Sequence, residues 1–176
     1  MQIKNISYSL NSRLKKTDYH CSMNQNICIL LGSNLGDART QLDQAIHLLE
    51  LNGVAVLKKS SIYKTAAWGK QDQPEFLNQV LLCASKYSAE KVLEICLNTE
   101  QAMGRIRTEK WEARIIDIDI LLFDEQVIQL PNLQVPHPFL PQRRFSLVPL
   151  AELIPNFQHL ILKQPIHQLL ENCPDK

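Results

Sequence analysis

Two aspartates on one predicted strand have the residue type and the spacing that metal chemistry needs. The run Ile116-Asp117-Ile118-Asp119-Ile120 alternates acidic and apolar side chains. Because successive side chains of a strand point to opposite faces, both carboxylates are expected on one face, about 6–7 Å apart along the strand. Mg²⁺ prefers oxygen ligands and is typically held by one or two carboxylates together with substrate phosphates. The pair therefore predicts a magnesium site, the alternative being an acidic pair on a solvent-exposed sheet face.

Basic side chains precede this strand. Glu100 is followed by Arg105, Arg107, Lys110 and Arg114. Arginine binds phosphate through paired hydrogen bonds and neutralises charge on a transferring phosphoryl group, although each residue alone could belong to an ordinary exposed loop. No G-x-x-x-x-G-K-[ST] motif is present in the sequence, so phosphates would have to be held by side chains and metal ions. Together, the cations and the aspartates favour an enzyme that uses ATP.

Aromatic residues make up only 6% of the chain, but four of them lie in or beside the predicted loops: Trp68, Phe76, Trp111 and Phe145. A flat ring ligand would find stacking partners among them, although core packing is the alternative for Phe76 and Phe145. Asn78 lies on the same strand face as Phe76 and offers a donor and an acceptor to the edge of a heterocycle. These residues indicate a planar substrate beside the phosphates.

Two other motifs carry less information. Arg143 and Arg144 form a second basic cluster after Pro136-His137-Pro138, which alone would be a surface patch. The run Gly32-Ser33-Asn34-Leu35-Gly36 is interpreted as a tight strand-to-helix connection rather than a phosphate-binding loop, because Gly, Ser and Asn are common turn residues.

The elements that would position these residues follow a definite order. Apolar periodicity, with caps at Asp37 and Ser88, predicts a strand from Asn26, a helix at 37–53, strands at 54–65 and 76–85 separated by a loop, a helix at 88–104 and a strand at 115–123. This order predicts a ferredoxin-like βαββαβ sandwich of class α+β, with an antiparallel sheet, helices on one face and a C-terminal extension. Four prolines between Pro131 and Pro141 exclude a long helix there, and a short helix is expected near 146–153.

Length and charge limit the class of protein. A chain of 176 residues is long enough for one domain, taken as residues 23–176, and residues 1–22 are expected to be a disordered leader. The net charge of +1 argues against binding nucleic acid or a membrane through the overall field. Five scattered cysteines without metal-binding spacing, and no apolar run long enough to cross a bilayer, predict a cytoplasmic protein. We expect a monomer.

Several segments of the sequence together resemble the 6-hydroxymethyl-7,8-dihydropterin pyrophosphokinase family. They are Gly32–Gly36, Tyr63–Thr65, Gln71–Asn78, Gly104–Arg107, Trp111, Arg114–Leu121 and Val135–His137. The similarity extends from Asn26 to Pro155, with the segments in the order and spacing of the family. The resemblance implies a ferredoxin-like fold, two Mg²⁺ ions, and transfer of pyrophosphate from ATP to the hydroxymethyl oxygen of the pterin, leaving AMP, in folate biosynthesis.

The resemblance also implies a role for each matching residue. Asp117 and Asp119 would hold both magnesium ions, and Arg105 and Arg114 would stabilise charge on the transferring group. The nucleotide site would be lined by Glu100, Arg107, Trp111, His137 and Arg143. The pterin would stack between Phe76 and Phe145, with its edge bound by Asn78 and the Thr65 backbone. No residue is implied as a dedicated general base, so rate enhancement would come from positioning and electrostatics.

Two other functions are alternatives at this point. A ferredoxin-like RNA-binding module displays aromatic side chains on its sheet to stack bases, but the net charge and the Asp-x-Asp strand argue against it. An ATP-dependent transferase that acts on a different flat heterocycle is closer, and only a panel of substrates would distinguish it.

Overall fold

The computed structural model describes residues 24–67, 72–105 and 113–175. Its main sheet contains β1 (Asn24–Ser33), β2 (Ala55–Lys59), β3 (Tyr63–Thr65), β4 (Phe76–Ser85) and β5 (Asp117–Phe123). The strands run antiparallel in the order β2-β4-β1-β5, and β3 also pairs with β4. Helix α1 (Ala38–Leu51) follows β1 and helix α2 (Ala89–Ala102) follows β4. This is the predicted ferredoxin-like α+β arrangement.

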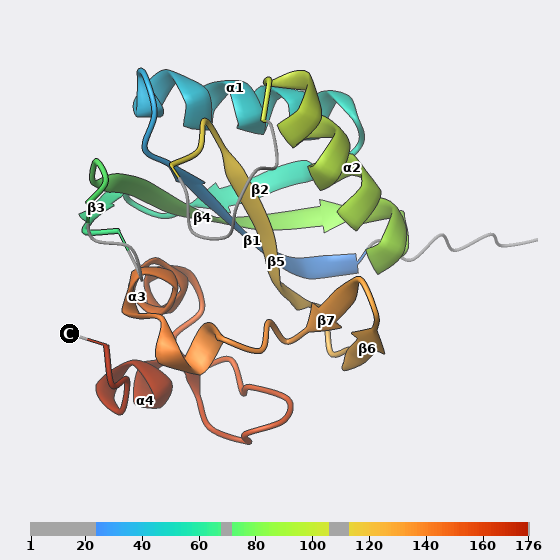
Figure 1. The fold of residues 1–176 in the computed structure, drawn as a ribbon. Helices are drawn as coiled ribbons and strands as arrows, with labels where there is room; N and C mark the ends of the chain where they lie inside the picture. The colour runs from blue at the N-terminus through green and yellow to red at the C-terminus, as the bar shows by residue number, and fades with distance from the viewer. Residues whose placement is uncertain (1–23, 68–71, 106–112, 176) are drawn as a thin grey trace, which may run out of the picture.

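The two helices begin where the sequence provides capping residues. The side chain of Asp37 accepts a hydrogen bond from Thr40 N, and that of Ser88 accepts one from Lys91 N, which satisfies backbone donors that a helix start leaves open. Both helices cover the same face of the sheet (Figure 1). The core between helices and sheet includes Ile29, Leu31, Leu42, Leu49, Val92 and Cys96.

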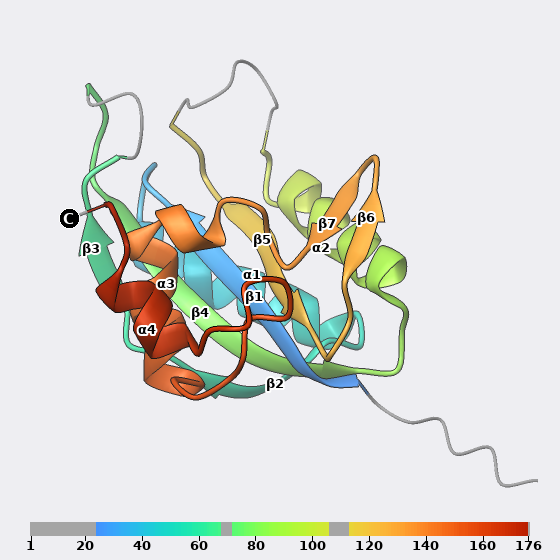
Figure 2. The ribbon, with the colours of Figure 1, turned by 90° about the horizontal axis from the view of Figure 1, so that it is seen from below.

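The C-terminal part of the chain covers the opposite face. After β5 come β6 (Ile128–Leu130), β7 (Leu133–Val135), the short helix η1 (Leu140–Gln142), α3 (Arg144–Leu153) and α4 (Ile166–Glu171). Figures 1 and 2 show α3 and α4 on the side of the sheet away from α1 and α2. A second core joins these helices to the strands and includes Cys28, Leu30, Val80, Leu121, Leu147 and Leu150. The helix predicted near 146–153 is confirmed, whereas the sequence pattern does not predict α4.

The strand predicted over 54–65 is two strands in the structure. Ser60, at the break, is 5% exposed. Its N–H donates to Val80 O at 2.9 Å, and its hydroxyl accepts from Val80 N at 3.0 Å and donates to Ser61 O at 2.8 Å. Because a side-chain hydroxyl replaces a strand carbonyl as the partner of Val80, the chain leaves the ladder before it pairs with β4 again as β3. The hydrophobic pattern of the sequence does not reveal that the Ser60 hydroxyl takes the place of a backbone carbonyl.

Other predictions about the chain concern membrane spans, the N-terminal leader and the cysteines. Within the described ranges, no helix is long and apolar enough to span a membrane. The leader predicted at 1–22 lies outside the described residues. Cys28, Cys83, Cys96 and Cys173 are free thiols, and burial raises the pKa of Cys83 to about 12.

His159 links the pH of the solution to the stability of the C-terminal segment. It is 4% exposed, and its Nδ1 accepts a hydrogen bond from Leu162 N at 3.2 Å. Burial lowers the pKa of His159 below its ordinary value, so the folded protein favours the neutral form. Below about pH 6.5 the His159 imidazole is protonated in the unfolded chain, whereas in the folded chain it binds the proton less readily. The contribution of this group to stability is therefore present above that pH and is lost as the pH falls.

We expect His159→Asn to reduce this loss, because the amide oxygen can replace Nδ1 as the acceptor and does not titrate. The measurement is the free energy of unfolding by urea at about pH 7.5 and about pH 5.5. The loss between these conditions should be smaller in the variant, by up to about 1.4 kcal/mol for each pH unit. An equal loss in both proteins would assign the pH dependence to other groups.

Candidate active site

Asp117 and Asp119 lie at the start of β5, on the sheet face that α3 covers. Asp117 is opposite Gly32 of β1 in the strand register. Ile118 and Ile120 point to the other face and are each only 4% exposed. The predicted arrangement of two carboxylates on one face and isoleucines on the other is therefore what the strand adopts.

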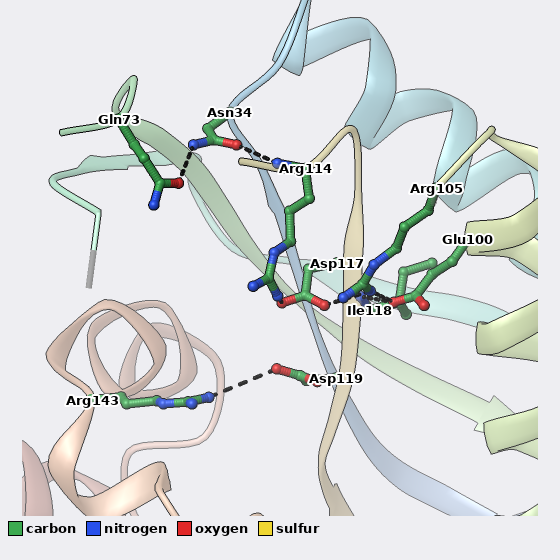
Figure 3. A network of polar contacts seen from close by, with 9 residues as sticks. All are labelled: Asn34, Gln73, Glu100, Arg105, Arg114, Asp117, Ile118, Asp119 and Arg143. Carbon is green, nitrogen blue, oxygen red and sulfur yellow. Dashed lines mark hydrogen bonds and ion pairs between the residues drawn. The ribbon is translucent and has the colours of Figure 1, made fainter. Parts of the chain in front are cut away.

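Three arginines from separate segments converge on these carboxylates (Figure 3). Asp117 Oδ1 lies 2.6 Å from Arg105 Nη1, and Asp117 Oδ2 lies 2.6 Å from Arg114 Nη1. Arg143 Nη1, just before α3, lies 3.8 Å from Asp119 Oδ2. Since Arg105 follows α2, Arg114 precedes β5 and Arg143 precedes α3, the fold brings cations from three segments around one pair of anions. Guanidinium groups in such a cluster can bind phosphate oxygens in the same way as carboxylate oxygens.

Glu100 holds Arg105 and the start of β5 together. Glu100 is only 3% exposed. Its Oε1 accepts a hydrogen bond from Ile118 N at 2.8 Å and forms an ion pair with Arg105. This places Glu100 behind the arginine, on the side of α2 (Figure 3). Its implied contact with a nucleotide stays a prediction. Two other residues implied in the nucleotide site, Arg107 and Trp111, lie outside the described residues.

Burial and the neighbouring carboxylate make a negative charge unfavourable at Asp119. Burial, and then the neighbouring Asp117 carboxylate, raise the pKa of Asp119 well above its ordinary value, and Arg143 only partly offsets this. A divalent cation beside both side chains would favour the ionised form. Two adjacent carboxylates on one strand face are also a donor set that Mg²⁺ accepts, because it completes its coordination with substrate phosphates and water. The residues present therefore fit the predicted metal.

His137 lies near this cluster as a neutral imidazole. Burial, and then the charge of Arg143, lower the pKa of His137 to about 4. Its Nδ1 accepts a hydrogen bond from Phe139 N at 3.2 Å, so we assign the proton to Nε2. His137 can therefore donate a hydrogen bond to a nucleotide, but at neutral pH it supplies no positive charge.

Arg143 lies over two phenylalanine rings. Its guanidinium carbon is 5.1 Å from the ring centroid of Phe139 and 5.7 Å from that of Phe145, which is within the range of cation–π interactions. Phe145 is thereby placed beside the arginine that faces Asp119. The sequence does not single out Phe139, and its only signal is its position two residues after His137.

The residues predicted to bind the pterin from β3 and β4 form another side of the site. Thr65 pairs with Phe76 across the two strands, and Asn78 Nδ2 donates to Thr65 Oγ1 at 2.8 Å. Gly32 lies between this group and Asp117. A Cβ at Gly32 would be 3.0 Å from Asn78 Oδ1, 3.8 Å from the Phe76 ring and 3.9 Å from Asp117 Cβ. The absent side chain thus keeps space open between the aromatic side and the carboxylates.

Asn34 joins the two segments that flank the site (Figure 3). Its Nδ2 donates to Pro74 O at 3.1 Å and to Gln73 Oε1 at 3.5 Å, while its Oδ1 accepts from Arg114 N at 2.8 Å. Gly32–Gly36 is the predicted connection from a strand to a helix, here from β1 to α1, and it has two further roles that the sequence does not indicate. Asn34 holds the segment before β4 against the segment before β5, and Gly32 provides the space described above. Turn propensity could not reveal either role, because the partners come from other parts of the chain.

We expect Gly32→Ala to weaken pterin binding. The added Cβ would be closer to Asn78 Oδ1 than ordinary van der Waals contact, so the amide must shift, and Phe76 and Asp117 leave little room for the backbone to move instead. Overpacking of this kind costs about 1–3 kcal/mol, which corresponds to roughly tenfold or more in an equilibrium constant. The measurement is the KM for the pterin at saturating ATP.

Ser33→Ala is the matched control for Gly32→Ala. Ser33 is the next residue of β1 and is fully buried, and its hydroxyl has no hydrogen-bond partner in the described part of the chain. Its removal is expected to be nearly neutral, because no hydrogen bond is lost. A pterin KM for Gly32→Ala equal to that of Ser33→Ala would contradict the role given to Gly32.

Comparison with known proteins identifies the family of this chain. Residues 28–155 match the family model of 7,8-dihydro-6-hydroxymethylpterin-pyrophosphokinase (HPPK). The 2-amino-4-hydroxy-6-hydroxymethyldihydropteridine pyrophosphokinase of Methylorubrum extorquens is 40% identical over 127 residues, which are 72% of this chain and 80% of that protein. The protein of the same name from Bacillus subtilis is 42% identical over 132 residues, covering 74% of this chain and 79% of its own length.

Solved structures support the fold. The wild-type HPPK-DHPS of Plasmodium falciparum superposes with a TM-score of 0.65 at 15% sequence identity. The match covers 85% of this chain, which spans 44% of the length of that protein. The similarity in structure concerns the fold alone, whereas the family model and the bacterial relatives establish kinship. The chain therefore belongs to the 7,8-dihydro-6-hydroxymethylpterin-pyrophosphokinase family.

Proposed function

We propose that this chain transfers the pyrophosphoryl group of ATP to 6-hydroxymethyl-7,8-dihydropterin at the cluster around Asp117 and Asp119. The hydroxymethyl oxygen forms a bond to the β-phosphorus, the bond between the β-phosphorus and the oxygen of the α-phosphate breaks, and AMP leaves. The alcohol proton passes to solvent. The observation that carries the proposal is the convergence of Arg105, Arg114 and Arg143 on two adjacent carboxylates in a member of this family.

Asp117 and Asp119 are the residues that would hold magnesium. When bound, two Mg²⁺ ions would neutralise phosphate charge and align the β-phosphorus with the attacking oxygen. The carboxylates would supply the protein oxygens of both coordination shells, with the remaining positions left to phosphates and water. Relief of the repulsion that raises the pKa of Asp119 would add to the affinity of this site.

The arginines would exchange one anionic partner for another during the reaction. Arg105 and Arg114 each contact one Asp117 oxygen at 2.6 Å. With ATP bound, the guanidiniums would turn from these oxygens toward the phosphate oxygens. They would then stabilise the negative charge that is spread over the transferring group in the transition state. Arg143, beside Asp119, would contact the nucleotide together with the Nε2 hydrogen of His137.

The pterin would lie between the aromatic residues of two elements. Phe76 from β4 and Phe145 from α3 would stack on its ring, and Asn78 and the Thr65 backbone would bind its edge. Gly32 leaves room for the ring next to Asp117, which would bring the hydroxymethyl group close to the phosphates. We assign no general base among the described residues, so the proposed rate enhancement comes from alignment and charge.

The test is product formation. The full chain is mixed with ATP, MgCl₂ and 6-hydroxymethyl-7,8-dihydropterin, and AMP and the pterin diphosphate are measured by chromatography. We expect equal amounts of both products, and none when EDTA is added or the pterin is omitted. Release of ADP, or no AMP in the complete mixture, would overturn the proposal.

Two alternatives are separated by the same assay. An RNA-binding module would bind RNA and release no AMP. A transferase for another flat heterocycle would release AMP only when a panel of heterocyclic alcohols supplies its substrate. The family membership and the site both favour the pterin. A monomer in the cytoplasm stays our expectation for the chain.

A further inference from the structure

Glu152, near the end of α3, accepts hydrogen bonds from Ser61, between β2 and β3, and from Tyr63, the first residue of β3. Ser61 N donates to both carboxylate oxygens at 3.0 Å, Ser61 Oγ donates to Oε1 at 3.1 Å, and Tyr63 Oη donates to Oε2 at 2.8 Å. Desolvation acts to raise the pKa of Glu152, but the Ser61 amide and the two hydroxyls lower it below its ordinary value. An exposed glutamate on a helix can be solvated by water alone. The hydrogen bonds from Ser61 and Tyr63 therefore specifically join α3 to β3 and the residues before it.

The two elements that Glu152 joins are those proposed to form opposite sides of the pterin site. On α3, Phe145 and Glu152 are seven residues apart, which is close to two turns, so they lie on the same helix face about 10 Å apart along the axis. On β3, Tyr63 and Thr65 are two residues apart and lie on the same strand face.

Phe145 lies beside Arg143, which faces Asp119. Thr65 is hydrogen-bonded to Asn78, which lies beside Gly32 opposite Asp117, so both faces lead from the Glu152 contact toward the carboxylates. Figure 1 shows α3 next to β3.

β3 has few other attachments, whereas α3 has many. In the described part of the chain, the three residues of β3 pair only with the first three residues of β4. In contrast, Leu147 and Leu150 of α3 are fully buried in the second core. Loss of the Glu152 contact should therefore leave α3 packed on the sheet. Its main effect should be that β3 can move relative to α3.

We propose that Glu152 is a positioning residue that sets the width of the gap between Phe145 and the side of the site formed by β3 and β4. The inference rests on the proposed function, because it concerns the pterin of that reaction. The stacking of a flat ring between two sides depends steeply on this width. An additional separation of about 0.5–1 Å between contacting atoms already removes a quarter to a half of their dispersion attraction. Glu152 touches no reacting atom, so it should control pterin binding more than the chemical step.

The experiment compares steady-state kinetics of the full chain and of Glu152→Ala. We expect the KM for the pterin to rise about tenfold, since a displacement of about 1 Å at a substrate can have effects of up to 10²-fold. The kcat at saturating pterin and the KM for ATP should stay within about twofold, because the arginines and aspartates are not displaced. Thermal unfolding of each variant is measured in parallel.

Two further variants distinguish an effect on the position of β3 from a general loss of stability. Tyr63→Phe removes one of the donors to Glu152 and preserves packing, so it should raise the pterin KM by less, and the double variant should add little to Glu152→Ala. Ser88→Ala removes the cap of α2 at the other end of the sheet, where Ser88 Oγ accepts from Lys91 N. It should lower the melting temperature without changing the pterin KM.

The outcomes are distinct. A selective rise in the pterin KM in Glu152→Ala and Tyr63→Phe, but not in Ser88→Ala, supports the inference. An unchanged pterin KM in both Glu152→Ala and Tyr63→Phe, or an equal rise in the KM values of pterin and ATP, overturns it while the proposed function stands. Failure of the unmodified chain to form AMP from ATP and the pterin overturns both.

Discussion

Replacement of either Asp117 or Asp119 by alanine is expected to abolish turnover while the fold persists. Both carboxylates lie on the face of β5 that points toward α3, and the strand is held by Ile118 and Ile120 on its other face, each 4% exposed. In the proposed function, each aspartate is a ligand of both metal ions, so the loss of either one would weaken the metal site. Several kcal/mol of transition-state stabilisation would be lost, and each 1.36 kcal/mol is a factor of ten, so kcat/KM should fall by about 10³-fold or more.

AMP release at saturating Mg²⁺ measures the rate, and circular dichroism and thermal unfolding report the fold. Asp124→Asn is the matched control. Asp124 lies just past the other end of β5, where its Oδ1 accepts from Asn26 N, and the amide of asparagine keeps that acceptor and tolerates the positive φ of 47°. This variant should retain near-normal rates. Near-normal turnover by either alanine variant in Mg²⁺ would show that the pair does not hold the catalytic metal.

Local patterns predict most of the scaffold of this site. Alternation at 116–120 decides which face carries the aspartates, because the period of a strand is two residues. Asp37 and Ser88 mark the helix starts, because short polar side chains accept from exposed amides of the first turn. The order of strands and helices then leads to the sheet, with β1 between β4 and β5. These features depend on neighbouring residues, so one sequence is enough to predict them.

The contacts that assemble the site depend on pairing across the chain. Asn34 reaches residues 40 and 80 positions away, and Glu152 reaches Ser61 over 91 positions. Turn and helix propensities describe the backbone at Asn34 and Glu152 and carry no information about which distant donors they meet. Ser60 is a similar case, because its hydroxyl replaces a strand carbonyl only once β4 lies beside it. Such roles become visible only in three dimensions.

Replacement of Arg114 by alanine is expected to lower kcat by about 10²–10³-fold, the usual effect of removing one preorganised donor from a developing anion. Binding of ATP should change much less, because the proposed role is in the transition state rather than the ground state. Arg114→Lys should recover part of the rate, since it restores a charge but not the planar fork of donors. Single-turnover AMP formation and ATP titration measure the two effects separately.

Arg144→Ala is the matched control for charge. Arg144 is the first residue of α3 and is exposed, and its removal should change the rate by less than about twofold, as for surface substitutions in general. If ATP affinity and kcat of Arg114→Ala both stayed near those of this control, the role proposed for Arg114 would be wrong.

Arg105→Ala should show the same loss of rate together with a loss of stability that Arg114→Ala lacks. Arg105 pairs both with Asp117 and with Glu100, whose side chain is 3% exposed. Removal of one partner of a buried ion pair destabilises a protein by about 3–5 kcal/mol, although the hydrogen bond from Ile118 N to Glu100 remains to reduce this. Urea unfolding of the two variants should therefore differ while their kcat values fall alike. Because Glu100 ties Arg105 to β5, the same ion pair that stabilises the fold also fixes the arginine beside the carboxylates.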